Sequence, residues 1–265
     1  MSWRFAWTPK WIVRHILVVL LCFVMVNLGL WQVRRLHEKE DRRDAVHAAE
    51  ALPTAPVGDV IPAGKPGDAA VKAVQYRRAT AQGTYVDKES VVVDNRTYNG
   101  ASGGWVLTPL VLSDGTALVV NRGFIGFDHD GNLVPPPAPK GTVEVEGFVL
   151  PTETRGSFGP RDPTGETLPV LARADLARYA QQLDEPILPA YLQLATSDPA
   201  EPQRSIDQPE LVPLDPPETD LGPHFSYAVQ WAIFTTIAAV GYVLLLRKVA
   251  KEQAEEERLD ALEHA

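Results

Sequence analysis

Two long runs of apolar residues lie near the two ends of the chain, and a mixture of polar and apolar residues separates them. The first run covers residues 16–33 (ILVVLLCFVMVNLGLWQV), and the second covers residues 226–246 (SYAVQWAIFTTIAAVGYVLLL). Because an α-helix rises about 1.5 Å per residue, roughly 20 mostly apolar residues cross the ~30 Å hydrocarbon core of a bilayer. The pattern therefore predicts transmembrane helices over residues 16–33 and 224–246.

The first run is too long for a secretory signal peptide. The apolar core of a signal peptide has about 7–15 residues and precedes a small-residue cleavage site. Here the run continues into WQVRRLHEKE, which contains no such site. We therefore expect an uncleaved anchor. The short, serine-poor opening MSWRFAWTPKW does not resemble an organellar transit peptide, which favours a bacterial source.

Basic residues beside the second run set the expected orientation. Arg247, Lys248 and Lys251 follow it, whereas Arg204 is the only basic residue between 204 and 223. The first run alone favours the opposite orientation, since three basic residues precede it and five follow it within residues 34–43. Long loops translocate largely regardless of charge, so we give the second run more weight. We expect a bacterial plasma membrane protein with both tails, 1–15 and 247–265, in the cytoplasm.

The segment between the two runs changes character three times. Residues 34–50 are strongly charged and are expected to extend the first helix into water. Within residues 34–74 the extension is followed by a stretch with repeated Pro and Gly, for which we expect a flexible connector. Residues 75–198 form the expected extracytoplasmic domain. Seven prolines in residues 199–223 predict a second connector without regular structure.

The pattern in the central domain is typical of a mainly β structure. Short segments rich in Val, Thr and aromatic residues are bounded by Gly or Asp, and they predict strands at residues 77–86, 90–96, 104–112, 116–125 and 142–150. Ser113-Asp114-Gly115 is typical of a hairpin turn joining residues 105–125. A minor helix is expected near residues 172–183, followed by a strand at 186–196. We predict an antiparallel barrel or sandwich-like domain between two transmembrane helices.

Charge and motif content exclude several function classes. A net charge of −9 is unlike the basic face of a nucleic-acid-binding protein. The single cysteine, Cys22, lies in the first apolar run, so no internal disulfide is expected. No HExxH, CxxC or GxSxG motif occurs, and GDVIPAGKP lacks the glycine spacing and the Ser or Thr of a phosphate loop. We expect no enzyme.

The most informative polar residues lie where the predicted helices meet the outer membrane surface. On the first helix these are Trp31, Gln32 and Arg35, and on the second they are His224, Tyr227, Gln230 and Trp231. The common explanation is an aromatic belt with an anchoring arginine. The other is a helix-borne histidine that ligates a haem iron, with arginines near the propionates. The residue pattern alone leaves both open.

Four ordered blocks resemble a known family. They are LGLWQVRR, GTYV, GGWVLTPLVLSDGTALVVNRGFI and HFSYAVQW, in the family's order and within its helix, outside domain, helix layout. The chain is similar to the surfeit locus protein 1 family of cytochrome c oxidase assembly factors. Its opening, WRFAWTPKWIVRHIL, resembles the actinobacterial branch.

The resemblance implies roles for individual residues. His224 matches the family histidine that opens the second helix and would be the axial ligand of haem a, with its nitrogen on the iron. Tyr227, Gln230 and Trp231 match the rest of that block, and Trp31, Gln32 and Arg35 match the first-helix block. Arg122 and Gly123 match an Asn-Arg-Gly segment, for which we expect a tight backbone turn and an outward charge. Gly126 departs from the family, which usually has a proline there.

These implications predict a chaperone for a haem a-containing oxidase. It would accept haem a from the membrane-bound synthase and pass it to the catalytic subunit. The alternative is a structural accessory subunit that stabilises the oxidase or a respiratory supercomplex without binding haem. An enzyme acting on envelope substrates is poorly supported, because no nucleophile, base or metal cluster is evident.

Overall fold

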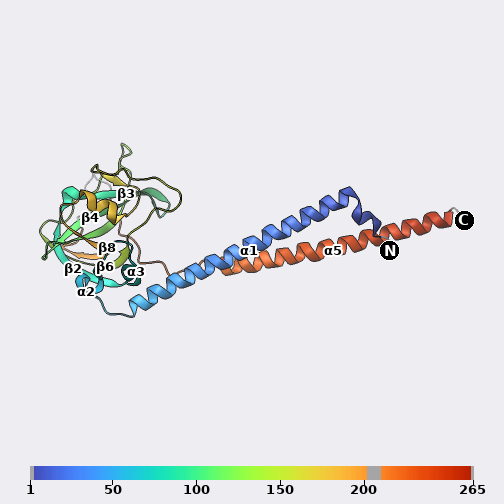
Figure 1. The fold of residues 1–265 in the computed structure, drawn as a ribbon, viewed down its shortest axis with the longest axis horizontal. Coiled ribbons are helices and arrows are strands. Elements are labelled where there is room, and N and C mark those ends of the chain that lie inside the picture. The colour runs from blue at the N-terminus through green and yellow to red at the C-terminus, as the bar shows by residue number, and fades with distance from the viewer. Residues whose placement is uncertain (1–2, 202–209, 264–265) are drawn as a thin grey trace. The chain divides into compact units, whose positions relative to one another are not determined.

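The computed structural model describes residues 3–201 and 210–263 of the 265-residue chain (Figure 1). The chain divides into two compact units, which we describe separately. One unit comprises Met1–Arg43 with Thr219–Ala265, and the other comprises Asp44–Glu218.

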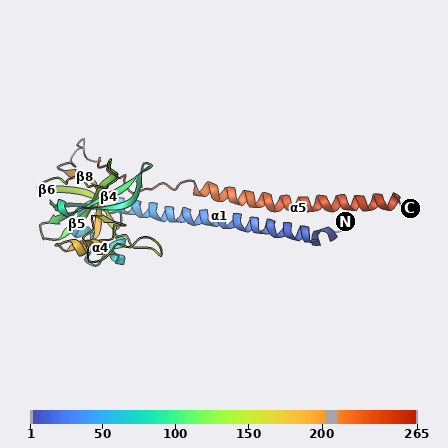
Figure 2. The same ribbon diagram turned by 90° about the horizontal axis from the view of Figure 1, so that it is seen from above.

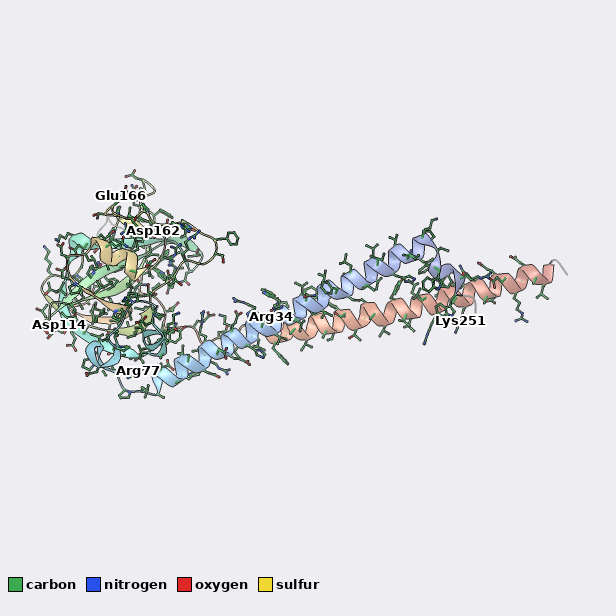
Figure 3. All side chains as sticks on the ribbon, viewed as in Figure 1. Arg34, Arg77, Asp114, Asp162, Glu166 and Lys251 are labelled. Carbon is green, nitrogen blue, oxygen red and sulfur yellow. The ribbon has the colours of Figure 1, made fainter. Side chains whose placement is uncertain are left out.

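The first unit is dominated by two long helices that run antiparallel (Figure 2). A short 3-10 helix, η1 (Arg4–Trp7), precedes α1 (Pro9–Glu50), and α5 spans His224–Glu263. By length and composition, both long helices are able to cross a membrane. Arg34 follows the apolar part of α1, and Lys251 follows that of α5 (Figure 3). The first predicted span and the charged extension form one continuous helix.

The two helices contact each other along a seam with a repeat of three or four residues. On α5 the half-buried positions in this stretch begin at His224 and recur at Ala228, Trp231, Thr235, Ala238 and Tyr242. Steps of three and four residues place these positions on one side of the helix, which contacts the partner helix. Near the start of α1, a 2.6 Å hydrogen bond joins His15 Nδ1 to the Tyr242 hydroxyl. His15 Nε2 also lies 3.0 Å from the Ala6 carbonyl oxygen.

The second unit is a closed β-barrel, so the predicted mainly β fold is confirmed and a sandwich is not found. The barrel order is β2-β6-β8-β5-β4, and a second pairing of β2 with β4 closes it. Most pairs are antiparallel, whereas β5–β8, β1–β2 and β3–β7 are parallel. The strands are β1 (Ala55–Pro56), β2 (Arg78–Tyr85), β3 (Val91–Tyr98), β4 (Ala101–Leu112), β5 (Ala117–Gly126), β6 (Thr142–Pro151), β7 (Val170–Leu171) and β8 (Ile187–Asp198).

All six predicted strands are present. The alternation of buried and exposed residues along them explains how the core is filled. In β2, every second residue from Ala79 to Tyr85 is buried, whereas Thr80, Gln82 and Thr84 between them are more exposed. Alternate side chains of a strand point to opposite faces, so the buried set fills the barrel. β4 and β5 are joined through Ser113-Asp114-Gly115, as the hairpin signal predicts.

A second core cluster lies outside the barrel under a short helical segment. α4 (Leu176–Tyr179) and η3 (Ala180–Gln182) fall within the predicted helix at 172–183 but are shorter than it. The Asp175 side chain caps α4 by accepting from the Arg178 backbone N–H. The buried Tyr179 hydroxyl donates to the Glu89 carbonyl of η2 (Asp87–Glu89) at 2.5 Å. Burial raises the pKa of the Tyr179 hydroxyl well above its usual value.

The segment after the charged extension was expected to be a flexible connector, but part of it has regular structure. Within it, α2 (Val57–Val60) and α3 (Ala69–Ala73) form short helices. Val57, Val60 and Val71 are buried in the barrel core. Pro and Gly mark the breaks between elements, but the valines between them bury enough apolar surface to hold the segment on the barrel.

Candidate functional site

His224 and Gln32 form the polar contact that joins the two helices at one end of the seam. His224 is the first residue of α5, directly after Pro223, and its Nδ1 lies 2.8 Å from Gln32 Oε1. A carbonyl oxygen is an acceptor only, so Nδ1 carries the proton and donates it. In a neutral imidazole the other nitrogen, Nε2, then keeps its lone pair. Among the described residues, none forms a hydrogen bond with Nε2.

The two helices approach each other closely beside this pair, at Gly29 and Trp231. A Cβ placed on Gly29 would lie 3.4 Å from the Cβ of Trp231. Small residues let helix backbones approach closely in lipid. The Trp231 ring is half-buried and meets Phe234 edge-on, with ring centroids 6.1 Å apart. The sequence prediction named Gln32 and Trp231, whereas it missed Gly29 and the second histidine contact, His15 with Tyr242.

The remaining predicted site residues lie on more exposed positions of the same helices. Trp31 is 49% exposed and Tyr227 is 46% exposed, and Gln230 is also exposed. Arg35 forms an ion pair with Glu38 one turn along α1. The structure therefore brings His224, Gln32 and Trp231 together on the seam and leaves Trp31, Tyr227 and Gln230 facing outward.

An apolar groove runs along one side of the seam. Its volume is about 560 Å³, and it is lined by Met25, Val26, Gly29, Leu30 and Val33 of α1 and by Ala228, Ala232, Thr235, Thr236, Ala239 and Val240 of α5. Ala228 is one helical turn from His224, so the groove begins close to the polar pair. Within the described residues, no group of three or more His, Cys, Asp or Glu side chains could hold a bare metal ion.

Arg122 does not present an outward charge, so that expectation is wrong. Its side chain is completely buried and pairs with Glu201, with Nη2 2.5 Å from Oε2. It also donates to the carbonyl oxygens of Pro136 and Pro137 at 2.9 and 3.0 Å. Arg122 therefore connects the barrel to two proline-containing segments, one at Pro136 and Pro137 and one at Glu201.

The cause is a β-bulge in place of the expected tight turn. Asn121 pairs with Leu107 and Gly123 pairs with Val106, so Arg122 is an extra residue on β5. A bulge re-aims a side chain and bends its strand. Gly123 has a φ of +149°, and a Cβ there would lie 2.6 Å from the Val212 carbonyl oxygen.

This bulge also binds the proline-rich segment that precedes α5. Phe124 and Val212 exchange two backbone hydrogen bonds of 2.8 Å each, and Gln193 Nε2 donates to the Asp215 carbonyl at 2.8 Å. Part of the predicted 199–223 connector is thus held on the barrel. Residues 202–209 lie outside the described residues.

Two apolar helices flanking a closed β-barrel fit a membrane protein. The SURF1 family model matches residues 19–236, which cover most of α1, the whole barrel and the first part of α5. The chain therefore belongs to the SURF1 family, which is generally linked to cytochrome oxidase assembly.

Relatives with curated sequences carry the same family name. Uncharacterised SURF1-like proteins of Mycobacterium tuberculosis and Mycobacterium bovis are each 25% identical over 238 residues, covering 88% of this chain and 82% of the relative. A SURF1-like protein of Dictyostelium discoideum is 38% identical over 50 residues, covering 19% of this chain and 18% of the relative. The mycobacterial relatives confirm the expected actinobacterial affinity.

Proposed function

We propose that this protein assists assembly of a haem a-containing cytochrome oxidase by holding haem a at His224. The observation that carries the proposal is the 2.8 Å contact between His224 Nδ1 and Gln32 Oε1. Ligating histidines commonly donate their other ring N–H to an oxygen, which fixes the tautomer and the ring orientation. Because His224 Nδ1 donates to Gln32, His224 Nε2 keeps the lone pair that binding to iron requires.

The surroundings of His224 suit a macrocycle with apolar edges. When bound, haem would supply an iron that accepts an imidazole nitrogen as a ligand. His224 would hold the iron, Gln32 would orient His224, and Trp231 would supply an apolar contact. Tyr227, Gln230 and Trp31 would meet the exposed edges, and Arg35 would contact a propionate after releasing Glu38. A single neutral ligand suits a carrier that must release its cargo.

The same proposal includes location and partners. We place the protein in a bacterial plasma membrane with both termini cytoplasmic and the barrel outside. Three basic residues directly after the apolar part of α5 support this orientation. Its partners would be the oxidase catalytic subunit and the haem a synthase.

The test measures haem a in the purified full-length protein after coexpression with haem a synthesis. Wild type is compared with His224→Ala and with His15→Ala, the matched control on the same helix seam. Both ring nitrogens of His15 already have hydrogen-bond partners, so it offers no free ligand. We expect wild type and His15→Ala to retain haem a, as identified by absorption spectrum and extraction, and His224→Ala to lose most of it.

Two other outcomes contradict the proposal. Equal haem a in all three proteins would remove His224 as the ligand. Haem a absent from folded wild type, in cells that demonstrably make it, would favour the structural accessory subunit. That alternative predicts stoichiometric copurification with the mature oxidase, whereas an assembly factor should be substoichiometric.

A further inference from the structure

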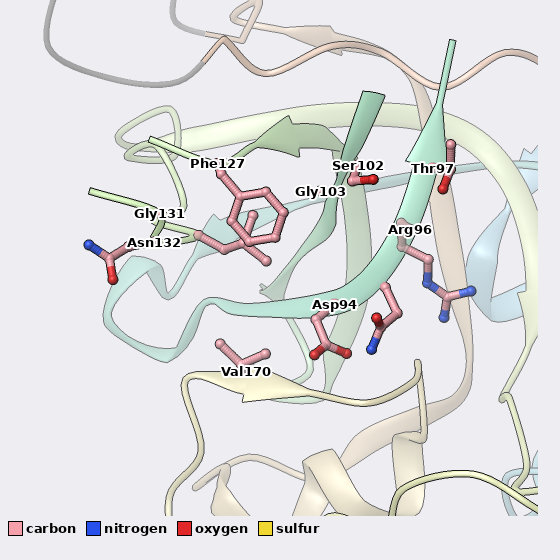
Figure 4. A pocket seen from close by; sticks show the side chains of 11 residues that line it. Asp94, Arg96, Thr97, Ser102, Gly103, Phe127, Gly131, Asn132 and Val170 are labelled. Atoms are coloured by element: carbon pink, nitrogen blue, oxygen red, sulfur yellow. The ribbon is translucent and has the colours of Figure 1, made fainter. Parts of the chain in front are cut away.

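The barrel unit contains a polar pocket that shares no residue with the proposed haem site. The inference drawn from it therefore does not rest on the haem proposal. The pocket has a volume of about 410 Å³, and Figure 4 shows the side chains around it. β3, the start of β4 and the loop after β5 form its walls. The residues that matter below are Asp94, Arg96, Phe127, Leu133 and Val170.

A second β-bulge positions Asp94 in this pocket. Val93 pairs with Trp105 and Arg96 pairs with Gly103, so β3 has one more residue than β4 in this interval. Asn95 has a φ of +52°, which an asparagine tolerates better than most residues do. Bulges commonly re-aim a side chain beside a functional site.

The Asp94 carboxylate lacks a partner for one of its oxygens among the described residues. Oδ1 is buried, yet it accepts no hydrogen bond from that part of the chain. Arg96 does not neutralise it, because the Arg96 guanidinium pairs with Glu153 and stacks 3.9 Å over Trp105. Buried carboxylate oxygens are normally hydrogen-bonded or paired with a cation. The pocket therefore offers a carboxylate that forms no ion pair with the described residues, and a cationic donor complements it best.

The walls of the pocket complement the rest of a basic side chain. Phe127 is 52% exposed beside the pocket, and Leu133 and Val170 add aliphatic surface. Lysine and arginine lay their methylene stems along apolar surface, and their charged heads are attracted to aromatic faces. The net charge of −9 favours a basic partner further.

We propose that this pocket receives a lysine or arginine side chain from a partner polypeptide. The charged head pairs with Asp94, and the stem packs on Phe127, Leu133 and Val170. The pocket is thus a docking point on the barrel unit, and it shares no residue with the proposed haem site.

The experiment is an NMR titration of the isotope-labelled full-length protein in detergent micelles. The probes are two capped peptides, one with a single lysine in a Gly-Ser sequence and one with norleucine in its place. We expect the lysine peptide to shift the amide signals of Asn95, Thr97 and Asn132 saturably. Asp94→Asn should weaken binding about tenfold or more, since charge-assisted hydrogen bonds are roughly twice as strong as neutral ones.

Asp184→Asn is the matched control. Asp184 is an exposed carboxylate outside the pocket, so this substitution makes the same change in net charge. It should bind the lysine peptide like wild type. Equal shifts from both peptides, equal weakening in the two variants, or no shift up to the solubility limit of the lysine peptide would each overturn the proposal.

Discussion

At the scale of single residues, the absence of a side chain at Gly123 has a consequence that can be tested. Its φ is +149°, and the Cβ of an alanine there would lie 2.6 Å from the Val212 carbonyl oxygen, so alanine cannot fit without movement of the backbone. We expect Gly123→Ala to destabilise the protein by about 1–3 kcal/mol, the usual cost of such backbone strain. The measurement is the apparent melting temperature of the full-length protein in detergent, which should fall by several degrees.

Gly126→Ala is the control for that prediction. Gly126 ends the same strand, and a Cβ there would meet nothing within 4 Å. It should melt within about 2 °C of wild type, because surface substitutions without a special role change stability little. If both variants melt alike, the close approach of Val212 is not a constraint.

The positions of single residues could be predicted from the sequence where neighbouring residues determine them. The prediction failed where strand register determines whether a side chain is buried. A proline before His224 marks the helix start, and α5 begins there. Arg122 was expected to present an outward charge at a tight backbone turn, but a bulge there shifts the strand register by one residue and the Arg122 side chain is buried. Nothing in a single sequence reports that shift.

At the scale of elements, the antiparallel register of α1 and α5 can be tested with a disulfide. A Cβ at position 29 would lie 3.4 Å from the Cβ of Trp231, close to the roughly 3.5–4.5 Å found in disulfides. We expect Gly29→Cys with Trp231→Cys, in a Cys22→Ala background, to form an intramolecular disulfide under mild oxidation. The measurement is a reducible mobility shift on a denaturing gel, with mass spectrometry of the linked peptides.

Phe234→Cys replaces Trp231→Cys in the matched control pair. Phe234 is exposed and one turn further along α5, away from the half-buried seam positions. This pair should remain reduced under the same conditions. A disulfide in the control but not in the Trp231 pair would contradict the register that brings Gln32 to His224.

Most of the helices and strands could be predicted from the sequence, whereas the contacts between them could not. Alternation predicted the strands, and the apolar runs predicted the helices. Closure of the barrel needs the pairing of Gly83 with Leu112, and the parallel pairing of β5 with β8 joins Val119 to Tyr191. Such long-range pairs depend on the whole fold, and the sequence pattern is compatible with a sandwich as well.

At the scale of the whole molecule, the proposed topology requires the two ends of the chain to share one side of the membrane. Two spans return the chain to its starting side, and the basic residues after the second span favour the cytoplasm there. Single cysteines in a Cys22→Ala background can report each position: Trp7→Cys, Asp184→Cys and Glu257→Cys, all at exposed residues. A membrane-impermeant maleimide is applied to spheroplasts before and after lysis.

We expect Asp184→Cys to react in intact spheroplasts, and Trp7→Cys and Glu257→Cys to react only after lysis. Labelling of all three before lysis would mean that the spheroplasts leak, which a cytoplasmic marker protein checks. Opposite behaviour of Trp7→Cys and Glu257→Cys would show that only one helix spans the membrane. The reverse pattern, with both ends outside, would contradict the proposed orientation, because it would place the barrel in the cytoplasm and His224 at the cytoplasmic surface of the membrane.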